Sequence, residues 1–393
     1  MGCHTVVRET ARREWAARRA IVPVTLALAI VVALGVIARP SAALMRRVVV
    51  GPDPVAMVVD APAGRLYVMD HLDGVLRVID TATGALVQRI AAGGSGPLAV
   101  DTGSGRLFVA AAWNGPDHSG VYTDHAVVRV FDGRSGALVR TIALGVDEDV
   151  LALLADGARA EGGGRVVALC ASVALVLDAR SGAVLHRIRA GATPYAAAAA
   201  LDPARGRAFV LTSDARALDV LAVGRGTIVR TVVLGGYLTG VAVDRRADRV
   251  VVADASGGQV RLLDEDTLRL MVSVPVGGPP AAVATDGHSA SIVVVANTRP
   301  PGGGSAHRGG VLVMDGRTGV VRRRVSVTGT PVLVAVDPRT NHLFVGALHD
   351  TGAGTPVPWD RVPVWLRRWL PWARPPTRAT AAPNTVETID RAG

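Results

Sequence analysis

After residue 50, short apolar runs alternate with turns that contain Asp and Gly along the whole chain. A first run ends in Asp and is followed about five residues later by a basic or polar residue and a second run. This pair occurs seven times, with the Asp at positions 60, 101, 156, 202, 244, 286 and 337. The spacings of 41 to 55 residues indicate a repeat architecture with one supersecondary unit per copy.

Each copy continues into a third and a fourth apolar run. The third ends in a turn such as VIDTATG (78–84) or VFDGRSG (130–136), where Asp accepts hydrogen bonds from turn amides and Gly supplies a positive φ. The fourth ends at a Gly, as in IAAG (90–93). Ala222 replaces the turn Asp in the fourth copy and Leu268 replaces the turn Gly in the fifth. These two turns are expected to be the least regular.

Four short strands per repeat predict an all-β fold, a seven-bladed β-propeller of four-stranded antiparallel blades, because one such sheet cannot bury both of its faces alone. The last copy ends at Gly393 after its third strand, and RRVVVG (46–51) matches the fourth-strand pattern. We therefore expect strand 46–50 to complete blade 7 and to remove an exposed edge. The propeller is predicted to span residues 46–393.

One N-terminal segment could cross a membrane. Residues 20–38 are apolar and uncharged, close to the roughly 20 residues that a transmembrane helix needs. Five Arg precede them in the basic segment 1–19 and residues 39–45 form a linker, so the positive-inside rule predicts a single-pass signal anchor in the cell membrane with an extracytoplasmic propeller. The alternative is secretion after cleavage near Ala43.

The repeats resemble the YVTN (YncE-like) β-propeller family, through AVDPRTNHLFVGA (335–347) and VIDTATGALV (78–87). The resemblance covers residues 46–393 and implies a propeller of the WD40-like or quinoprotein-like superfamily. It leaves function open, because such propellers include envelope binding proteins, redox-enzyme subunits, and lactonase-like or lyase-like enzymes. True WD40 repeats are disfavoured, because the six Trp fall outside the repeated runs.

Composition and charge exclude several functions. The formal charge of +10 comes from residues 1–47 and 359–378, which leaves the body neutral and argues against a nucleic-acid groove. All 43 basic residues are Arg, a bias typical of a GC-rich bacterial genome. Without Lys, the chain cannot form a Walker A loop or a Schiff base. Cys3 and Cys170 are not expected to pair, and Cys170 is predicted to be a buried small hydrophobe.

Candidate site residues gather on one face, which we call the top face: the face of the loops between second and third strands and of the links between blades. Three long insertions are predicted there, at 111–126, 297–310 and 350–384. Their exposed candidates are Trp113, Asn114, Asn297 and Arg299. Imidazole and carboxylate side chains in these loops could bind a divalent metal or act in acid-base catalysis, namely His71, Asp73, His118, His125, His349 and Asp350. The simpler interpretation is that they are ordinary polar loop residues.

The blade-7 insertion contains a Trp- and Arg-rich segment, 359–376, with the spacing of a short amphipathic helix. We expect it to form a lid or a partner interface, and membrane contact is the second alternative. Its interface residues are Trp359, Trp365, Leu366, Arg367, Arg368, Trp369 and Trp372.

Together these patterns predict a membrane-tethered, extracytoplasmic scaffold that binds an envelope protein or a small ligand, without a cofactor and without catalysis of its own. The alternative is a metal-assisted lactonase-like or lyase-like enzyme that uses His71, His118, His125 and His349.

Overall fold

The structure is a computed structural model. It describes residues 46–51, 53–94, 96–116, 122–146, 148–157, 164–191, 193–212, 216–286, 289–298, 308–327, 329–348 and 384–390. All of them belong to one compact unit. The predicted anchor at 20–38 lies outside these residues. Within the ranges given, no helix has the length and apolarity that a membrane crossing requires.

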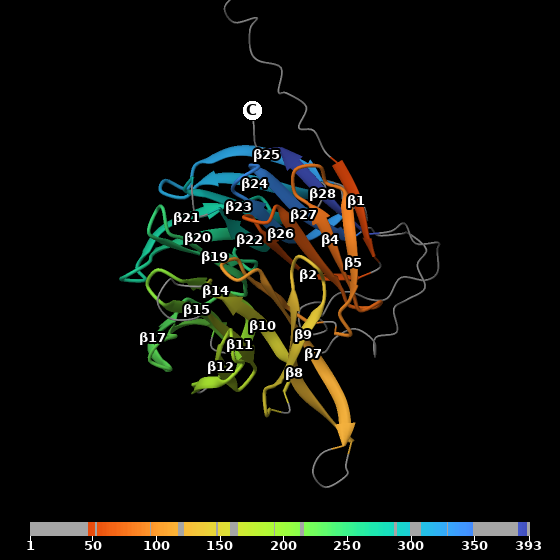
Figure 1. The fold of residues 1–393 in the computed structure, drawn as a ribbon. Helices are drawn as coiled ribbons and strands as arrows, with labels where there is room; N and C mark the ends of the chain where they lie inside the picture. The colour runs from red at the N-terminus through yellow and green to blue at the C-terminus, as the bar shows by residue number, and fades with distance from the viewer. Residues whose placement is uncertain are drawn as a thin grey trace, which may run out of the picture. The chain divides into compact units, whose positions relative to one another are not determined.

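The described residues form seven four-stranded antiparallel sheets arranged around an axis, so the predicted seven-bladed all-β propeller is confirmed (Figure 1). From the innermost to the outermost strand, blade 1 contains β2 (Pro54–Asp60), β3 (Arg65–Asp70), β4 (Val75–Asp80) and β5 (Leu86–Ala91), and blade 2 contains β6 (Leu98–Asp101), β7 (Arg106–Pro116), β8 (Tyr122–Asp132) and β9 (Leu138–Ala143). Blade 3 contains β10 (Val150–Ala155), β11 (Arg165–Cys170), β12 (Val173–Asp178) and β13 (Val184–Arg189), and blade 4 contains β14 (Tyr195–Asp202), β15 (Arg207–Thr212), β16 (Ala217–Ala222) and β17 (Thr227–Val233). Blade 5 contains β18 (Leu238–Asp244), β19 (Arg249–Asp254), β20 (Gln259–Asp264) and β21 (Leu270–Pro275), and blade 6 contains β22 (Pro280–Thr285), β23 (Ser291–Thr298), β24 (Arg308–Asp315) and β25 (Val321–Val327). Blade 7 contains β26 (Thr330–Asp337), β27 (His342–Leu348), β28 (Asn384–Asp390) and β1 (Arg46–Gly51).

Blade 7 is closed by the N-terminal strand of the ring, as the repeat pattern predicts. β1 pairs antiparallel with β28, with Arg46 opposite Thr388 and Val48 opposite Val386. Arg47 forms an ion pair with the fully buried Glu387, at 3.0 Å between Nε and Oε1. Strands separated by more than 330 positions in the sequence thus complete one sheet, and no blade is left with three strands.

The blades hold together because successive residues of the middle strands face opposite neighbours. In β19, Val250 and Val252 pack with blade 4, whereas Val251 packs with blade 6. In β3, Leu66 and Val68 likewise join the core shared with blade 7. Both faces of each middle strand are therefore buried. For this reason the middle strands are continuous apolar runs and do not alternate apolar with polar residues.

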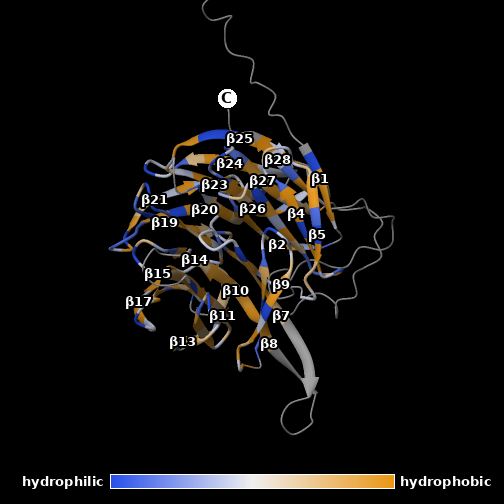
Figure 2. Ribbon diagram, in the orientation of Figure 1, coloured by the Kyte–Doolittle hydropathy of each residue, from blue (hydrophilic) through white to orange (hydrophobic). Residues whose placement is uncertain are grey.

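The outermost strands are only half-buried and carry more polar residues, which Figure 2 shows as hydrophilic segments on β5 and β25. Cys170, at the end of β11, is free and fully buried, as predicted. Burial raises the pKa of its thiol to about 12, so this Cys serves as a small apolar residue.

The two turns that the sequence marks as irregular keep the main backbone hydrogen bond of the other turns, and the blade-4 turn adds a second bond, from the amide of Arg225 to the carbonyl of Ala222 at 3.0 Å. In both, the amide of the fifth turn residue donates to the carbonyl of the first: Gly226 to Ala222 at 2.9 Å and Leu268 to Asp264 at 2.8 Å. Leu268 adopts a φ of 55° and is 4% exposed. The backbone hydrogen bond and the burial of this Leu side chain offset the strain that a non-Gly residue meets there.

The β1 closure generates the first prediction. Val50 is fully buried between blades 7 and 1, whereas its neighbour Val49 is 53% exposed. Val50→Ala should lower the free energy of unfolding by about 1–3 kcal/mol, and Val49→Ala by less than about 0.5 kcal/mol. Urea denaturation of the two variants measures both values, and equal effects would show that β1 does not pack into the ring.

Candidate functional site

The two faces of the propeller carry different kinds of loop. The top face holds the loops between second and third strands and the links between blades, since strands within a blade alternate in direction. We call the opposite face the bottom face. It holds the turns from the first to the second strand and from the third to the fourth.

On the top face of blade 1, the predicted site residues His71 and Asp73 lie in the turn between β3 and β4. Asp70, fully buried at the end of β3, accepts hydrogen bonds from the amides of Leu72 and Asp73 at 3.0 and 3.1 Å. Asp73 itself forms an ion pair with Arg77, at 2.5 Å between Oδ2 and Nη2. The Asp73 carboxylate is therefore already paired with an Arg side chain of its own blade.

His71 lies beside a second carboxyl group, the half-buried Asp53. Its amide donates to the carbonyl of Asp53 at 2.8 Å, and the amide of Asp53 donates to Oδ2 of Asp70 at 2.7 Å. Burial raises the pKa of Asp53 to about 6, against the attraction of His71, and the charge of Asp70 raises it further.

The metal-binding prediction gains no support from the described ranges, where no group of three His, Cys, Asp or Glu side chains is placed to hold a metal ion. Of the predicted ligands, His118, His349 and Asp350 lie outside the described residues, and His125 is described in its backbone alone. Arg299 and the whole segment 359–376 also lie outside them. The metal site, the lid and the interface remain predictions.

The predicted loop 111–126 is largely a strand extension. β7 and β8 each have 11 residues, and their pairing continues to Pro116 opposite Tyr122. Trp113 lies opposite His125, and Asn114 opposite Asp124. In Figure 1 this hairpin extends beyond the other strands of its blade. Asn297, on β23 opposite Gly309, has a buried side-chain oxygen without a hydrogen-bond partner in the described part of the chain.

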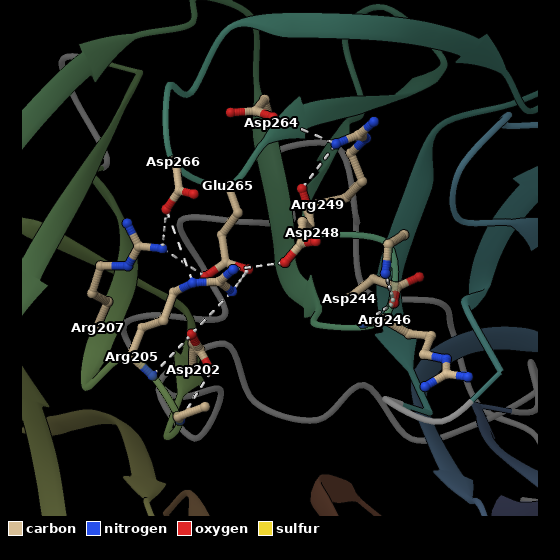
Figure 3. Close-up of polar contacts among 12 residues, drawn as sticks. Asp202, Arg205, Arg207, Asp244, Arg246, Asp248, Arg249, Asp264, Glu265 and Asp266 are labelled. Atoms are coloured by element: carbon tan, nitrogen blue, oxygen red, sulfur yellow. Dashed lines mark hydrogen bonds and ion pairs between the residues drawn. The ribbon is translucent and has the colours of Figure 1, made fainter.

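The bottom face carries a charged network that the sequence analysis did not predict. It joins blades 4 and 5 and is shown in Figure 3. Glu265 lies in the turn from the third to the fourth strand of blade 5 and is 1% exposed. Its carboxyl group accepts hydrogen bonds from Arg205 at 2.8 Å and from Arg207 at 2.9 Å. The outer acids of the network are Asp248, 2.7 Å from Arg205, and Asp266, 2.8 Å from Arg207.

Two carboxyl groups meet at the centre of this network. Asp202, at the end of β14, is fully buried beside Glu265 and lies 3.6 Å from Arg205. Burial and the neighbouring Asp202 raise the pKa of Glu265 to about 7, although both Arg side chains oppose the shift. The hydrogen bond to Asp248 raises the pKa of Arg205, and the charges of Glu265 and Asp202 add to this shift. The joint therefore holds a proton that it can release near neutral pH.

A comparison of equivalent turn positions in the repeats shows which sequence feature could have predicted this charged network. The residue after the third-strand Asp, or after Ala222 in blade 4, is small or apolar in blades 1 to 4 and 6, namely Thr81, Gly133, Ala179, Val223 and Gly316. In blade 5 it is Glu265. Space explains the small residues: a Cβ on Gly316 would lie 2.0 Å from Oδ2 of Asp244. Arg205 likewise occupies a place that Ala63 and Ser104 fill elsewhere. These two departures from the repeat contact each other.

Comparison with known proteins supports the fold alone. No protein-family model matches the chain. No curated protein matches it either. Among solved structures, the structure of U3-55K is similar, with a TM-score of 0.61 and 13% sequence identity over 88% of this chain and 98% of that one. At that identity the similarity establishes the propeller fold and leaves function open.

The Glu265 joint predicts a pH-dependent stability. In the folded chain Glu265 keeps its proton up to about pH 7, whereas in the unfolded chain it loses it near the ordinary Glu pKa of about 4.3. The free energy of unfolding should therefore fall as pH rises through this interval, by about 1–3 kcal/mol from this group. Glu265→Gln should remove that component of the slope, as measured by urea denaturation from pH 4.5 to 8.

The control is Asp266→Asn, which removes a neighbouring carboxylate that is 67% exposed and also contacts Arg207. This variant should keep the slope of the wild-type chain. If Glu265→Gln and the wild-type chain show the same pH dependence, Glu265 titrates in the ordinary range and the joint is a simple ion pair.

Proposed function

We propose that this chain is a YVTN-type propeller, tethered to the membrane on its extracytoplasmic side, that acts as a binding scaffold for an envelope protein without catalysis of its own. The observation that carries the proposal is the β7–β8 hairpin on the top face. In the described part of the chain, this hairpin has the longest strands, 11 residues each against six to eight in the corresponding hairpins, and loops of this kind on a rigid scaffold commonly bind partners.

The outer half of the hairpin is a two-stranded ribbon. β6 pairs with β7 only from Arg106 to Val109, and β9 pairs with β8 only from Val127 to Phe131. Residues 112–116 and 122–125 therefore pair with each other and with no third strand in the described part of the chain. Among the described strands, none pairs with the outward backbone N–H and C=O groups of these residues.

An open strand edge favours one mode of binding. An extended segment of a partner can add to the edge as a further strand, so that backbone hydrogen bonds supply affinity and alternate side chains supply specificity. An isolated two-stranded hairpin is marginally stable in water, and a third strand would stabilise it. The partner is thus expected to be a protein with an extended segment, and the near-neutral body argues against nucleic acid.

The tether is supported by the sequence and by the entry point of the ring. Residues 20–38 could span a bilayer, with Arg residues on both sides. β1 begins at Arg46, opposite Thr388 near the end of β28. Since β28 runs toward the bottom face, the chain enters the ring there, and the top face with its hairpin points away from the entry.

Photo-crosslinking tests the scaffold. A photoreactive amino acid at position 114 in the full-length chain should yield a discrete adduct with an envelope protein in cells that express the chain naturally. The same amino acid at Leu72, which is 44% exposed in the short blade-1 loop on the same face, is the matched control and should yield none. Equal labelling from both positions, or no adduct from position 114, would refute binding at the hairpin.

Cell fractionation tests the tether. The full-length chain should remain in the membrane fraction after carbonate extraction, and the propeller should be digested by protease added from the extracytoplasmic side. Deletion of residues 20–38 should leave the chain soluble in the cytoplasm. A chain that carbonate releases, or that is processed near Ala43, would contradict an uncleaved anchor.

Metal analysis separates the scaffold from the enzyme alternative. We expect the purified full-length chain to contain less than about 0.1 equivalent of zinc, manganese, iron or calcium. A stoichiometric metal that the double variant His71→Ala/His349→Ala loses would replace the scaffold proposal with the metal-assisted enzyme.

A further inference from the structure

A polar pocket lies on the bottom face between blades 5 and 6. Its volume is about 280 Å³, and it is lined by Arg246, Ser289, Ala290, Asp315, Arg317 and Arg322. The first turn of blade 5 provides Arg246, and blade 6 provides the other five residues from both of its turns and from the start of β25. The space would hold several water molecules of about 30 Å³ each, and so a small polyatomic ion.

The lining carries three guanidinium groups and one carboxylate. Asp315 is committed twice: it forms an ion pair with Arg322, and it accepts from the amides of Arg317 and Thr318 at 3.0 and 2.8 Å. One of the three positive charges is therefore balanced within the lining. The other two belong to Arg246 and Arg317.

Neither of these guanidinium groups has a carboxylate at ion-pair distance within the described ranges. Arg317 donates to the backbone carbonyl of Arg246 at 3.4 Å, a long contact with a neutral acceptor. In Figure 3 the guanidinium of Arg246 extends away from every dashed contact. In contrast, Arg205 and Arg207 in the neighbouring joint are each paired with two acidic residues or more. Arg246 and Arg317 are thus two guanidinium groups of this pocket that no carboxylate contacts directly in the described part of the chain.

Two acids lie beneath the pocket, and both accept hydrogen bonds from the turns, although Oδ2 of Asp244 has no hydrogen-bond partner in the described part of the chain. Asp244 is fully buried and accepts from the amides of Arg246 and Ala247 at 3.0 and 3.1 Å, and it attracts Arg317 at longer range. Asp286 accepts from the amide of Ser289 at 2.8 Å and from the Ser289 hydroxyl. They hold the two first-strand turns in place, and the exposed Arg side chains remain above them.

We infer that this pocket binds a phosphate group. A guanidinium presents paired N–H donors that match two oxygens of a phosphate, and two such groups on adjacent turns can share one dianion. Arg246 and Arg317 supply the contacts, and hydrogen bonds to Asp244 and Asp315 fix the backbone of the two turns that carry them.

The phosphate group could come from free phosphate or from a lipid headgroup. The second source rests on the proposed tether. If residues 20–38 span the membrane, at most about 28 Å of extended chain (residues 39–46) separates them from β1. β1 begins on the bottom face, so this pocket would lie on the side of the ring from which the tether leaves. The pocket chemistry is the same for both sources.

Titration calorimetry with inorganic phosphate tests the pocket. The full-length chain in a maltoside detergent, which has neither charge nor phosphate, should bind phosphate saturably at one site at constant ionic strength. Arg246→Gln and Arg317→Gln should each weaken binding at least tenfold. Arg134→Gln is the matched control, because Arg134 has the same place in the GRSG turn of blade 2 that Arg317 has in the GRTG turn of blade 6, and it should change affinity less than twofold.

A second experiment distinguishes free phosphate from a lipid headgroup as the natural ligand. Phosphatidylglycerol added to the micelles should weaken the apparent affinity for phosphate in the wild-type chain if the headgroup occupies the pocket, and leave it unchanged if free phosphate is the ligand. Both outcomes keep a phosphate site. No saturable binding, or equal loss in all three variants with unchanged circular dichroism, would overturn it. The phosphate titration does not depend on the tether, so failure of the tether in cell fractionation would leave this result standing.

Discussion

A blade of this propeller is a sheet with two apolar faces, and it cannot bury either face by itself. The alternation in β19 makes the constraint visible, since Val250 and Val252 face blade 4 while Val251 faces blade 6. Each blade therefore needs a neighbour on both sides, and only a closed ring provides one for all seven. The pairing of β1 with β28 is the contact on which the ring depends, because without it blade 7 would lack its outermost strand.

The joints between blades repeat in position but differ in chemistry. In several, a basic or aromatic residue of the second strand reaches a backbone carbonyl in the last turn of the next blade: Tyr67 contacts Gly133 at 2.9 Å, and Nδ1 of His342 lies 2.7 Å from the carbonyl oxygen of Thr81. The joint between blades 4 and 5 replaces the carbonyl with the Glu265 carboxyl group. The next joint combines Gly316 with the Arg side chains that line the pocket. A symmetric fold thus acquires local sites by single substitutions in equivalent turns, and neither the core nor the strand register has to change.

The repeat pattern was sufficient to predict much of the architecture, because strand length, turn chemistry and apolar runs are local properties that recur in every copy. It was also sufficient to place the closing strand, since an incomplete last copy and an unassigned strand at 46–50 complement each other. It was misleading at Leu268, where burial and a backbone hydrogen bond replace the expected Gly, and at residues 111–126, where pairing extends through a predicted loop. Such contacts depend on neighbours that a local pattern does not contain.

The sequence by itself determined the number of blades, the order of their strands and the closure of the ring. Only the tertiary structure decided which charged side chains meet. Arg205 and Glu265 are 60 positions apart, and Arg246 and Arg317 are 71 apart. Each of these four residues is of a type that is common in exposed turns. Ring closure brings the turns of adjacent blades together at the bottom face. Burial there raises the pKa of Glu265 in the joint of blades 4 and 5, and the next joint brings Arg246 and Arg317 into one pocket.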